Sequence, residues 1–260
     1  MEKKLKIVAI VQGRLGSSRF PNKVIEKINS KSVSEIIYER LKCSQLINDI
    51  VFAIPKNESK YIDYLKKRKI RFYPGSKDNV LKRYYNCAKE NNADIIVRIT
   101  ADCPLVDSEL IDNLIKLFKK NNNLDLLTNN SPPSYPDGLD ISIFNFKTLK
   151  HSYLKAKTDY DKEHVVPYML RSKSIRKKNK KCELNLKHLR WTIDEKVDLE
   201  VIKEVFQHLK RNTFSWKKVL ELVKKKPDIF KKNSFIVRDE GSILSTGQKI
   251  WKRAKKIIPG

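Results

Sequence analysis

Short apolar runs alternate with longer segments of helical spacing through the first half of the chain, and this alternation constrains the fold most. The apolar runs have the length of buried strands, and they are residues 5–11, 49–54, 71–73 and 94–100. The segments with helical spacing are residues 32–43, 60–67, 79–91 and 108–120. Because strands that alternate with helices form parallel sheets covered on both faces, we predict a three-layer α/β domain with a mainly parallel central sheet.

After residue 121 the alternation becomes less regular. Residues 129–138 are rich in Asn, Ser and Pro and are expected to form a loop. We expect further strands at 139–144 and 183–192, and further helices at 146–157, 163–171, 196–209 and 216–225. We expect this part to close one flank of the same domain, so that residues 1–238 form one folded unit.

The net charge of +26 favours anionic partners. Only 13 of the 56 basic residues are arginine, and the lysines are spread along the chain. The densest lysine run, residues 173–181, has no interleaved aromatic side chains of the kind that stack on bases. We therefore favour small anionic substrates, and a basic RNA-binding module is the alternative from outside the enzymes.

The sequence also indicates in which cellular compartment the protein is expected. No run of about 18 apolar residues occurs, so no membrane-spanning helix is predicted. The first residues, Met-Glu-Lys-Lys-Leu-Lys, lack the apolar stretch and cleavage site of a signal peptide. The four cysteines lie far apart without a Cys-x-x-Cys pair, and they are Cys43, Cys87, Cys103 and Cys182. We expect a cytoplasmic protein with reduced thiols and no structural zinc.

The loop after the first predicted strand has the composition of a polyphosphate site. It combines glycines, serines, cations and a leading glutamine, namely Gln12, Gly13, Arg14, Gly16, Ser17, Ser18, Arg19 and Lys23. Glycine lets backbone N–H groups approach phosphate oxygens, and the cations offset the phosphate charge. The spacing differs from both the Walker A and the Gly-x-Gly-x-x-Gly patterns. We predict a solvent-facing nucleotide-binding loop, although an ordinary strand-to-helix turn has a similar composition.

A second candidate site follows the strand predicted at 94–100. There Asp102 lies two residues before Pro104, and a carboxylate fixed in this way can hold Mg²⁺ on a triphosphate. We expect Asp107 to begin the next helix, with Ser108 as its N-cap. Because parallel strands end at one edge of a sheet, the turn at Asp102 and the preceding loop are expected to converge on one site.

Four further segments complete an ordered set of motifs. They are Gly-Ser-x-Asp-Asn-Val-Leu-x-Arg-Tyr at 75–84, Tyr-Pro-Asp-Gly-Leu-Asp-Ile at 135–141, Glu-His-Val-Val-Pro-Tyr at 163–168 and Arg-Trp-Thr-Ile-Asp-Glu-x-x-Asp at 190–198. In this order the motifs resemble the cytidylyltransferases that activate acidic sugars, over residues 5–210. The resemblance is closest to the branch of spore-coat polysaccharide biosynthesis. It implies a glycosyltransferase-A-like nucleotide-binding fold, CTP as the donor, Mg²⁺ as the cofactor and an anionic acceptor.

The resemblance also implies roles for individual residues. The implied catalytic residues are Arg14, Lys23, Asp102 and Asp194, with the two aspartates as metal ligands. The implied nucleotide contacts are Gln12, Gly13, Gly16, Ser17, Arg19, Ser76, Asp78 and Arg98, with residues 75–84 over the base. The candidate acceptor contacts are Asp137, Asp140 and His164. As an alternative, the two aspartates orient Arg and His groups, and His164 is a core histidine paired with Asp140.

Three positions depart from the family pattern. Gly13 stands where the family usually has Ala, Ala101 stands where it usually has Gly, and Asn22 replaces a common Gly. None of these changes removes a charged group. We expect the methyl group of Ala101 to narrow the space beside the nucleotide and so to affect base specificity.

The motifs together predict transfer of CMP from CTP to an acceptor oxyanion, with release of pyrophosphate. The family favours a sugar acid as acceptor, and a small phosphate or phosphonate metabolite is the alternative. A nucleotide-sugar-dependent glycosyltransferase on the same fold is a second hypothesis. That class usually presents an Asp-x-Asp pair, whereas this chain has Ala-Asp-Cys at 101–103.

The last segment, residues 239–260, resembles the opening of class III, pyridoxal-phosphate-dependent aminotransferases, in which a helix precedes a Pro-Gly turn. We expect a helical tail or linker that leads into a fused aminotransferase domain and is dispensable for nucleotidyl transfer. A separate partner aminotransferase and a homodimer are the other assemblies that we expect.

Overall fold

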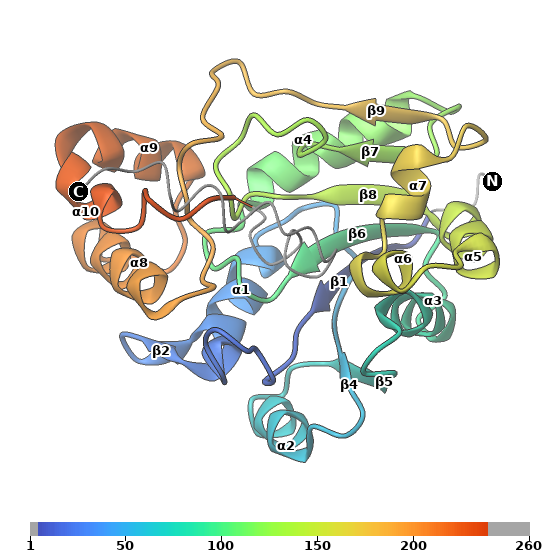
Figure 1. Cartoon of the computed structure of the whole chain (residues 1–260), viewed down its shortest axis with the longest axis horizontal. Helices are drawn as coiled ribbons and strands as arrows, with labels where there is room; N and C mark the ends of the chain where they lie inside the picture. Colours follow the sequence, from blue (N-terminus) through green and yellow to red (C-terminus); the bar gives the residue numbers. More distant parts are fainter. Residues whose placement is uncertain (1–4, 239–260) are drawn as a thin grey trace, which may run out of the picture.

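The computed structural model describes residues 5–238, so the tail expected at 239–260 lies outside the described residues. A seven-stranded sheet in the order β5-β4-β1-β6-β8-β7-β9 forms its centre (Figure 1). The strands are β1 (Ile7–Gln12), β4 (Asp49–Pro55), β5 (Phe72–Gly75), β6 (Ile95–Thr100), β7 (Leu126–Thr128), β8 (Ser142–Asn145) and β9 (Lys177–Asn179). β1, β4, β5 and β6 are parallel, whereas β8 runs antiparallel to β6 and β7. The predicted α/β fold with a mainly parallel sheet is confirmed.

Helices cover both faces of the sheet (Figure 1). One hydrophobic cluster, to which Ala9 and Val11 of the sheet belong, contains side chains of α1 (Val33–Lys42), α2 (Ser59–Lys67), α4 (Ser108–Lys120), α8 (Lys196–Leu209), α9 (Trp216–Lys225) and α10 (Pro227–Lys231). The other cluster contains side chains of α3 (Val80–Glu90), α5 (Phe146–Lys155) and α7 (Pro167–Arg171). β1 separates the two clusters, because Ala9 and Val11 point into the first and Val8 and Ile10 into the second. None of the helices within residues 5–238 combines the length and the apolar character that crossing a bilayer demands.

Several local expectations were wrong. Residues 183–192 form turns rather than a strand, with one isolated bridge between Arg190 and Asp137. The helix expected at 163–171 is divided into α6 (Asp159–His164) and α7, because Val165 between them has a φ of 70° and Pro167 begins a new helix. The N-cap of α4 is Asp107 and not Ser108, since the Asp107 carboxylate accepts a hydrogen bond from the N–H of Leu110 at 2.8 Å.

Six short elements of the structure were not expected from the sequence. β7 and β9 are three residues long, and β9 lies inside the lysine-rich run. A short 3₁₀ helix, Lys23–Ile25, ends the glycine-containing loop and is followed by the small hairpin of β2 (Lys27–Ile28) and β3 (Lys31–Ser32). The helix α10 follows α9 directly.

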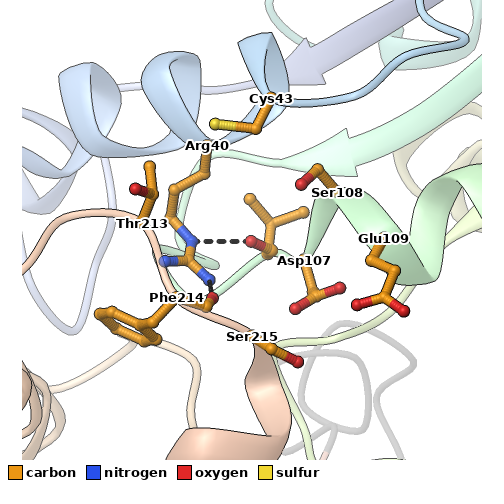
Figure 2. A pocket seen from close by; sticks show the side chains of 9 residues that line it. Arg40, Cys43, Asp107, Ser108, Glu109, Thr213, Phe214 and Ser215 are labelled. Atoms are coloured by element: carbon orange, nitrogen blue, oxygen red, sulfur yellow. Dashed lines mark hydrogen bonds between the residues drawn. The ribbon is translucent and has the colours of Figure 1, made fainter.

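A buried arginine fixes the turn that follows β6 (Figure 2). Arg40, on α1, donates hydrogen bonds to the carbonyl oxygens of Val106 at 2.7 Å, Asn212 at 2.8 Å and Phe214 at 2.8 Å. Its guanidinium also lies 4.4 Å from the centroid of the Phe214 ring. Burial lowers the pKa of Arg40 to about 10. The guanidinium thus joins the turn after β6 to the loop before α9.

Candidate active site

A cavity of about 690 Å³ opens where β1 and β6 end, at the carboxyl edge of the sheet. Most of the predicted site residues line it, namely Gln12, Gly13, Arg14, Ser17, Arg19, Lys23, Arg98, Asp102, Asp137, Asp140, His164 and Asp194. Three predicted residues, Gly16, Ser76 and Asp78, are not part of its wall. A cavity of this size suits a small-molecule ligand, and its position is the usual one for ligands of open α/β sheets.

Two carboxylates meet at the centre of the cavity, on one ammonium group. The Lys23 Nζ atom lies 2.8 Å from Oδ2 of Asp102 and 2.6 Å from Oδ1 of Asp194. Lys23 was expected in a solvent-facing loop, but it is only 7 % exposed, so the expectation was wrong at this residue. Burial opposes the charged ammonium, but the two carboxylates outweigh it and raise the pKa of Lys23. Burial likewise opposes ionisation of Asp102. The attraction and the hydrogen bond of the Lys23 ammonium outweigh this effect and lower the pKa of the carboxyl group.

The main chain brings these two aspartates together. The N–H of Ile193 donates a hydrogen bond to the carbonyl oxygen of Asp102 at 2.8 Å, so the turn after β6 and the segment before α8 lie side by side. Asp198, in the first turn of α8, accepts hydrogen bonds from the N–H groups of Asp194 and Glu195, each at 2.9 Å. The position of Asp194 is therefore fixed through its backbone.

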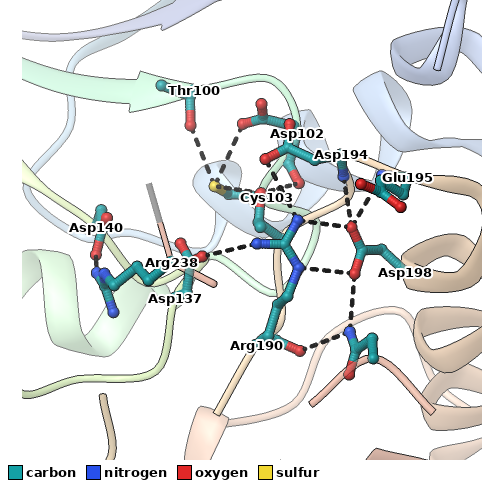
Figure 3. A network of polar contacts seen from close by, with 12 residues as sticks. Thr100, Asp102, Cys103, Asp137, Asp140, Arg190, Asp194, Glu195, Asp198 and Arg238 are labelled. Carbon is teal, nitrogen blue, oxygen red and sulfur yellow. Dashed lines mark hydrogen bonds and ion pairs between the residues drawn. The ribbon is translucent and has the colours of Figure 1, made fainter. Parts of the chain in front are cut away.

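A buried arginine connects the two sides of the cavity (Figure 3). Arg190 forms a two-pronged pair with Asp198, with both nitrogen-to-oxygen distances at 2.9 Å. Its remaining Nη1 lies 3.3 Å from Asp137, and its Nη2 lies 3.5 Å from Asp194. Arg190 and Asp198 belong to the motif at 190–198, but no role was predicted for either. The structure places them behind the carboxylates, where they orient Asp194 and Asp137.

Asp137 reaches this position because its backbone passes very close to Trp191. The N–H of Asp137 donates to the carbonyl oxygen of Leu189 at 2.9 Å, and the N–H of Trp191 donates to the carbonyl oxygen of Asp137 at 2.7 Å. The next residue, Gly138, has a φ of 105°, and a Cβ atom there would lie 2.6 Å from the carbonyl carbon of Trp191. Only glycine fits this approach.

The candidate acceptor contacts Asp137, Asp140 and His164 all line the cavity. Asp137 is paired with Arg190, and Asp140 is paired with Arg238 at the end of the described chain. This pairing agrees with the alternative that the aspartates orient cationic groups. Burial lowers the pKa of His164, so its imidazole is neutral at pH 7. Burial raises the pKa of the neighbouring Cys103 thiol well above its usual value, so it is not a thiolate nucleophile.

The glycine-containing loop is held by a carboxylate that the sequence analysis missed. Glu58 accepts hydrogen bonds from the N–H groups of Leu15 at 2.8 Å and Gly16 at 3.3 Å. These two N–H groups therefore point at Glu58 rather than into the cavity. Because Glu58 is 42 residues from Gly16 in sequence and belongs to no recognised motif, nothing in the sequence indicated this contact.

The segment at 75–84 touches the cavity through residues that were given no role. Val80 and the buried Arg83 line the cavity, and burial lowers the pKa of Arg83 to about 10. The hydroxyl of Ser76 instead accepts a hydrogen bond from the N–H of Asn79 at 3.1 Å. Asp78 lies in an adjoining cavity of about 440 Å³, which shares Arg14 with the larger one.

Gly13 and Ala101, two of the positions that depart from the family pattern, are in contact. A Cβ atom on Gly13 would lie 2.9 Å from the Cβ of Ala101 and 3.0 Å from the hydroxyl of Tyr61. Ala101 is only 1 % exposed, and its methyl group occupies the space next to Gly13. The methyl group absent at position 13 is therefore replaced by the methyl group of Ala101, and the two departures together leave the packed volume nearly unchanged.

We expect Gly13→Ala to destabilise the fold by about 1–3 kcal/mol, because the added methyl group overpacks this contact. Ala101→Gly in the same chain should recover much of the loss, since residues in contact are not additive. Urea unfolding of the wild type, both single variants and the double variant measures the coupling. Strictly additive effects would show that the two positions are independent.

Comparison with known proteins gives consistent matches over nearly the whole chain. The profile of a family described as cytidylyltransferase matches residues 8–250. "Uncharacterized protein MJ1063" of Methanocaldococcus jannaschii is 33 % identical over 235 residues, which cover 88 % of this chain and 95 % of the relative. The spore coat polysaccharide biosynthesis protein SpsF of Bacillus subtilis is 27 % identical over 234 residues, which cover 85 % of this chain and 95 % of SpsF.

Solved structures show the same fold. A cytidylyltransferase from Leptospira borgpetersenii superposes with a TM-score of 0.85 and 30 % identity, covering 90 % of this chain and all of that one. A CMP:2-keto-3-deoxy-manno-octonic acid synthetase solved with CTP superposes with a TM-score of 0.62 and 16 % identity. The superposition on the synthetase covers 78 % of this chain and 99 % of the synthetase chain.

Proposed function

The chain belongs to the cytidylyltransferase family, and from this membership we propose that it transfers CMP from CTP to an anionic acceptor and releases pyrophosphate. The observation that carries the proposal is the convergence of Asp102 and Asp194 on Lys23, in a cavity that the loop cations Arg14 and Arg19 also line. The family favours this reaction over both the nucleotide-sugar glycosyltransferase and the RNA-binding module.

The proposed reaction is an in-line displacement at the α-phosphorus of CTP. An acceptor oxygen forms a new bond to that phosphorus, and the bond from the α-phosphorus to the bridging oxygen of the β-phosphate breaks. The electron pair leaves with pyrophosphate. A carboxylate or phosphonate acceptor is already ionised, so the step needs positioning and charge neutralisation rather than a protein nucleophile.

The cations of the glycine-containing loop are suited to hold the departing group. Arg14 and Arg19 line the cavity beside Lys23, and their side chains are 48 %, 25 % and 9 % exposed in that order. Phosphate oxygens are strong acceptors for such groups, and each charged contact is worth about 1.5–3 kcal/mol. We assign these three residues to the β- and γ-phosphates.

The donor set at Asp102 and Asp194 suits Mg²⁺. Their oxygens already converge on one cationic atom, and Mg²⁺ binds through one or two carboxylates together with substrate phosphates. Within residues 5–238 no cluster of three His, Cys, Asp or Glu side chains is arranged for a metal. This fits a metal that takes its other ligands from the triphosphate. When bound, Mg²⁺ would neutralise the charge that builds on the α-phosphoryl group.

The acceptor is proposed to be a sugar acid or a small phosphate or phosphonate metabolite. The synthetase solved with CTP is named for a keto-deoxy sugar acid, and SpsF is named for polysaccharide biosynthesis. Asp137, Asp140 and the neutral His164, which line the cavity, would contact this acceptor. Paired aspartates and a neutral imidazole are suited to hydroxyl groups, whereas Arg98 on the same cavity is suited to a carboxylate.

We expect CTP with Mg²⁺ to raise the melting temperature more than ATP, GTP or UTP at the same concentration, because only the matching base gains contacts beyond the phosphates. Inorganic triphosphate is the control, since a chain of net charge +26 binds polyanions in general. Equal stabilisation by all four nucleotides and by triphosphate would contradict the cytidine preference. Pyrophosphate release from CTP with sugar acids and with phosphonates then identifies the acceptor class.

A further inference from the structure

Lys23 occupies the point at which the two candidate metal ligands converge. Its ammonium makes short contacts to an oxygen of Asp102 and an oxygen of Asp194, at 2.8 Å and 2.6 Å. The side chain is 9 % exposed, whereas those of the two aspartates are 26 % and 22 % exposed. A cation bound between these carboxylates would have to take the place of the ammonium.

The charges around the carboxylates are already balanced without a metal. Asp194 also lies 3.2 Å from Nη2 of Arg19 and 3.5 Å from Nη2 of Arg190. The two carboxylates therefore face three cationic groups, although Arg190 is shared with Asp198. A bare divalent ion entering here would meet like charges, and it would leave the Lys23 ammonium buried without its partners, which is costly.

We propose that Lys23 is a positioning residue whose ammonium group occupies the metal site until the nucleotide binds. In the nucleotide-free protein it holds Asp102 and Asp194 together and keeps divalent ions off them. When a nucleoside triphosphate arrives, its phosphate oxygens take over the ammonium, and the carboxylates become free for the metal. The metal therefore binds with the nucleotide or after it, and not before. This inference rests on the proposed function, because it takes the two aspartates as the metal ligands.

The cavity provides a route for this exchange. Lys23 lines the same space as Arg14, Ser17 and Arg19, the residues assigned to the phosphates. A lysine carries its charge on a flexible four-carbon stem, so the ammonium can move several ångströms while the backbone stays in place. The backbone itself is held by the turn at Asn22, which has a φ of 62°, and by the 3₁₀ helix that follows.

The test measures binding of Mn²⁺ alone, by electron paramagnetic resonance of the free ion, to the nucleotide-free protein. We expect Lys23→Met to bind Mn²⁺ at least tenfold more tightly than the wild type, because the two carboxylates lose their internal cation. Mn²⁺ should also raise the melting temperature of this variant and leave that of the wild type unchanged. A role that is only structural would not produce tighter binding.

Two control variants locate the effect. Arg14→Met removes one positive charge from the same cavity, but the contact of Arg14 is with Glu163 at 3.7 Å, so we expect little gain in Mn²⁺ affinity. The double variant Lys23→Met/Asp102→Asn should lose the gain, because one of the two carboxylates is then neutral. If Lys23→Met does not fold, Lys23→Gln serves in its place, since it keeps a polar group near the carboxylates.

Three results would overturn the inference: tight Mn²⁺ binding by the nucleotide-free wild type, no gain in the Lys23 variants, or an equal gain in Arg14→Met. None of these results concerns the transfer reaction itself. Transfer of CMP by the wild type is assayed separately, and a failure there would contradict the proposed function while the difference in Mn²⁺ affinity would still stand.

Discussion

Asp102→Asn and Asp194→Asn are each expected to lower CMP transfer by about 10²–10³-fold or more, the range seen when one group that stabilises transition-state charge is lost. Asparagine keeps the size of the side chain but removes the charge that holds Mg²⁺ and balances Lys23. The double variant should be little worse than either single variant, because residues that act as one unit are strongly non-additive. Initial rates at saturating CTP, over a range of Mg²⁺ concentrations, measure the effect.

The control for this experiment is Asp228→Asn, on the exposed surface of α10, which should keep the wild-type rate. Circular dichroism of each variant confirms that the fold survives, since neither change opens a cavity in the core. If Asp194→Asn kept near-normal turnover at saturating Mg²⁺, the two-carboxylate site would be wrong. Asp107 would then be a poor replacement, because its carboxylate already accepts hydrogen bonds from Leu110 and Trp216.

Asp198→Ala is expected to destabilise the protein by about 3–5 kcal/mol, the usual result of removing one partner from a buried ion pair. The Asp198 side chain is fully buried and receives both prongs of Arg190, two backbone N–H groups and the amide of Asn233. Its loss leaves all of these donors without their acceptor. Guanidinium unfolding at pH 7 measures the change, and Asp194 should lose its position at the same time.

The matched control is Asp228→Ala, which removes an exposed pair with Lys231 and should leave the unfolding midpoint unchanged.

Unfolding at acidic pH provides a second check. Burial opposes ionisation of Asp198, but Arg190 outweighs it and lowers the pKa of the carboxyl group. The stabilisation is therefore present at neutral pH and is lost as the pH falls through this lowered pKa. A difference between wild type and Asp198→Ala that did not narrow in acid would contradict this account.

The central sheet could be predicted because its strands are long enough to leave a pattern. β1, β4 and β6 have six or seven residues each and are mostly apolar. β7 and β9 have three residues, which is too short for any periodicity to be visible. Residues 183–192 have the pattern of a strand, since Leu186 lies two residues after Leu184 and Trp191 lies two residues after Leu189. Leu186 and Leu189 are buried, but they lie in turns, and the N–H of Leu186 donates a hydrogen bond to the carbonyl oxygen of Ser134.

Most of the predicted site residues line the cavity, with Gly16, Ser76 and Asp78 as the exceptions, but the contacts among them could not be predicted. Loops at the ends of parallel strands must meet, so the convergence of Asp102 with the glycine-containing loop followed from topology. The partners of Lys23 are 79 and 171 residues away in sequence, and a cation in a phosphate-binding loop gives no sign that it faces carboxylates. The contact of Glu58 with the same loop was hidden for the same reason.

The lysine-rich strand β9 has a consequence for how copies of the chain behave toward one another. In the described part of the chain β9 ends the sheet, so its outer edge has no neighbouring strand. An open edge of this kind can pair with the edge of another molecule and begin aggregation, and lysine side chains are a common defence. Lys177 and Lys178 lie exposed on this edge. Because this defence is electrostatic, it weakens as added salt screens the charges, and colloidal stability should therefore fall with ionic strength.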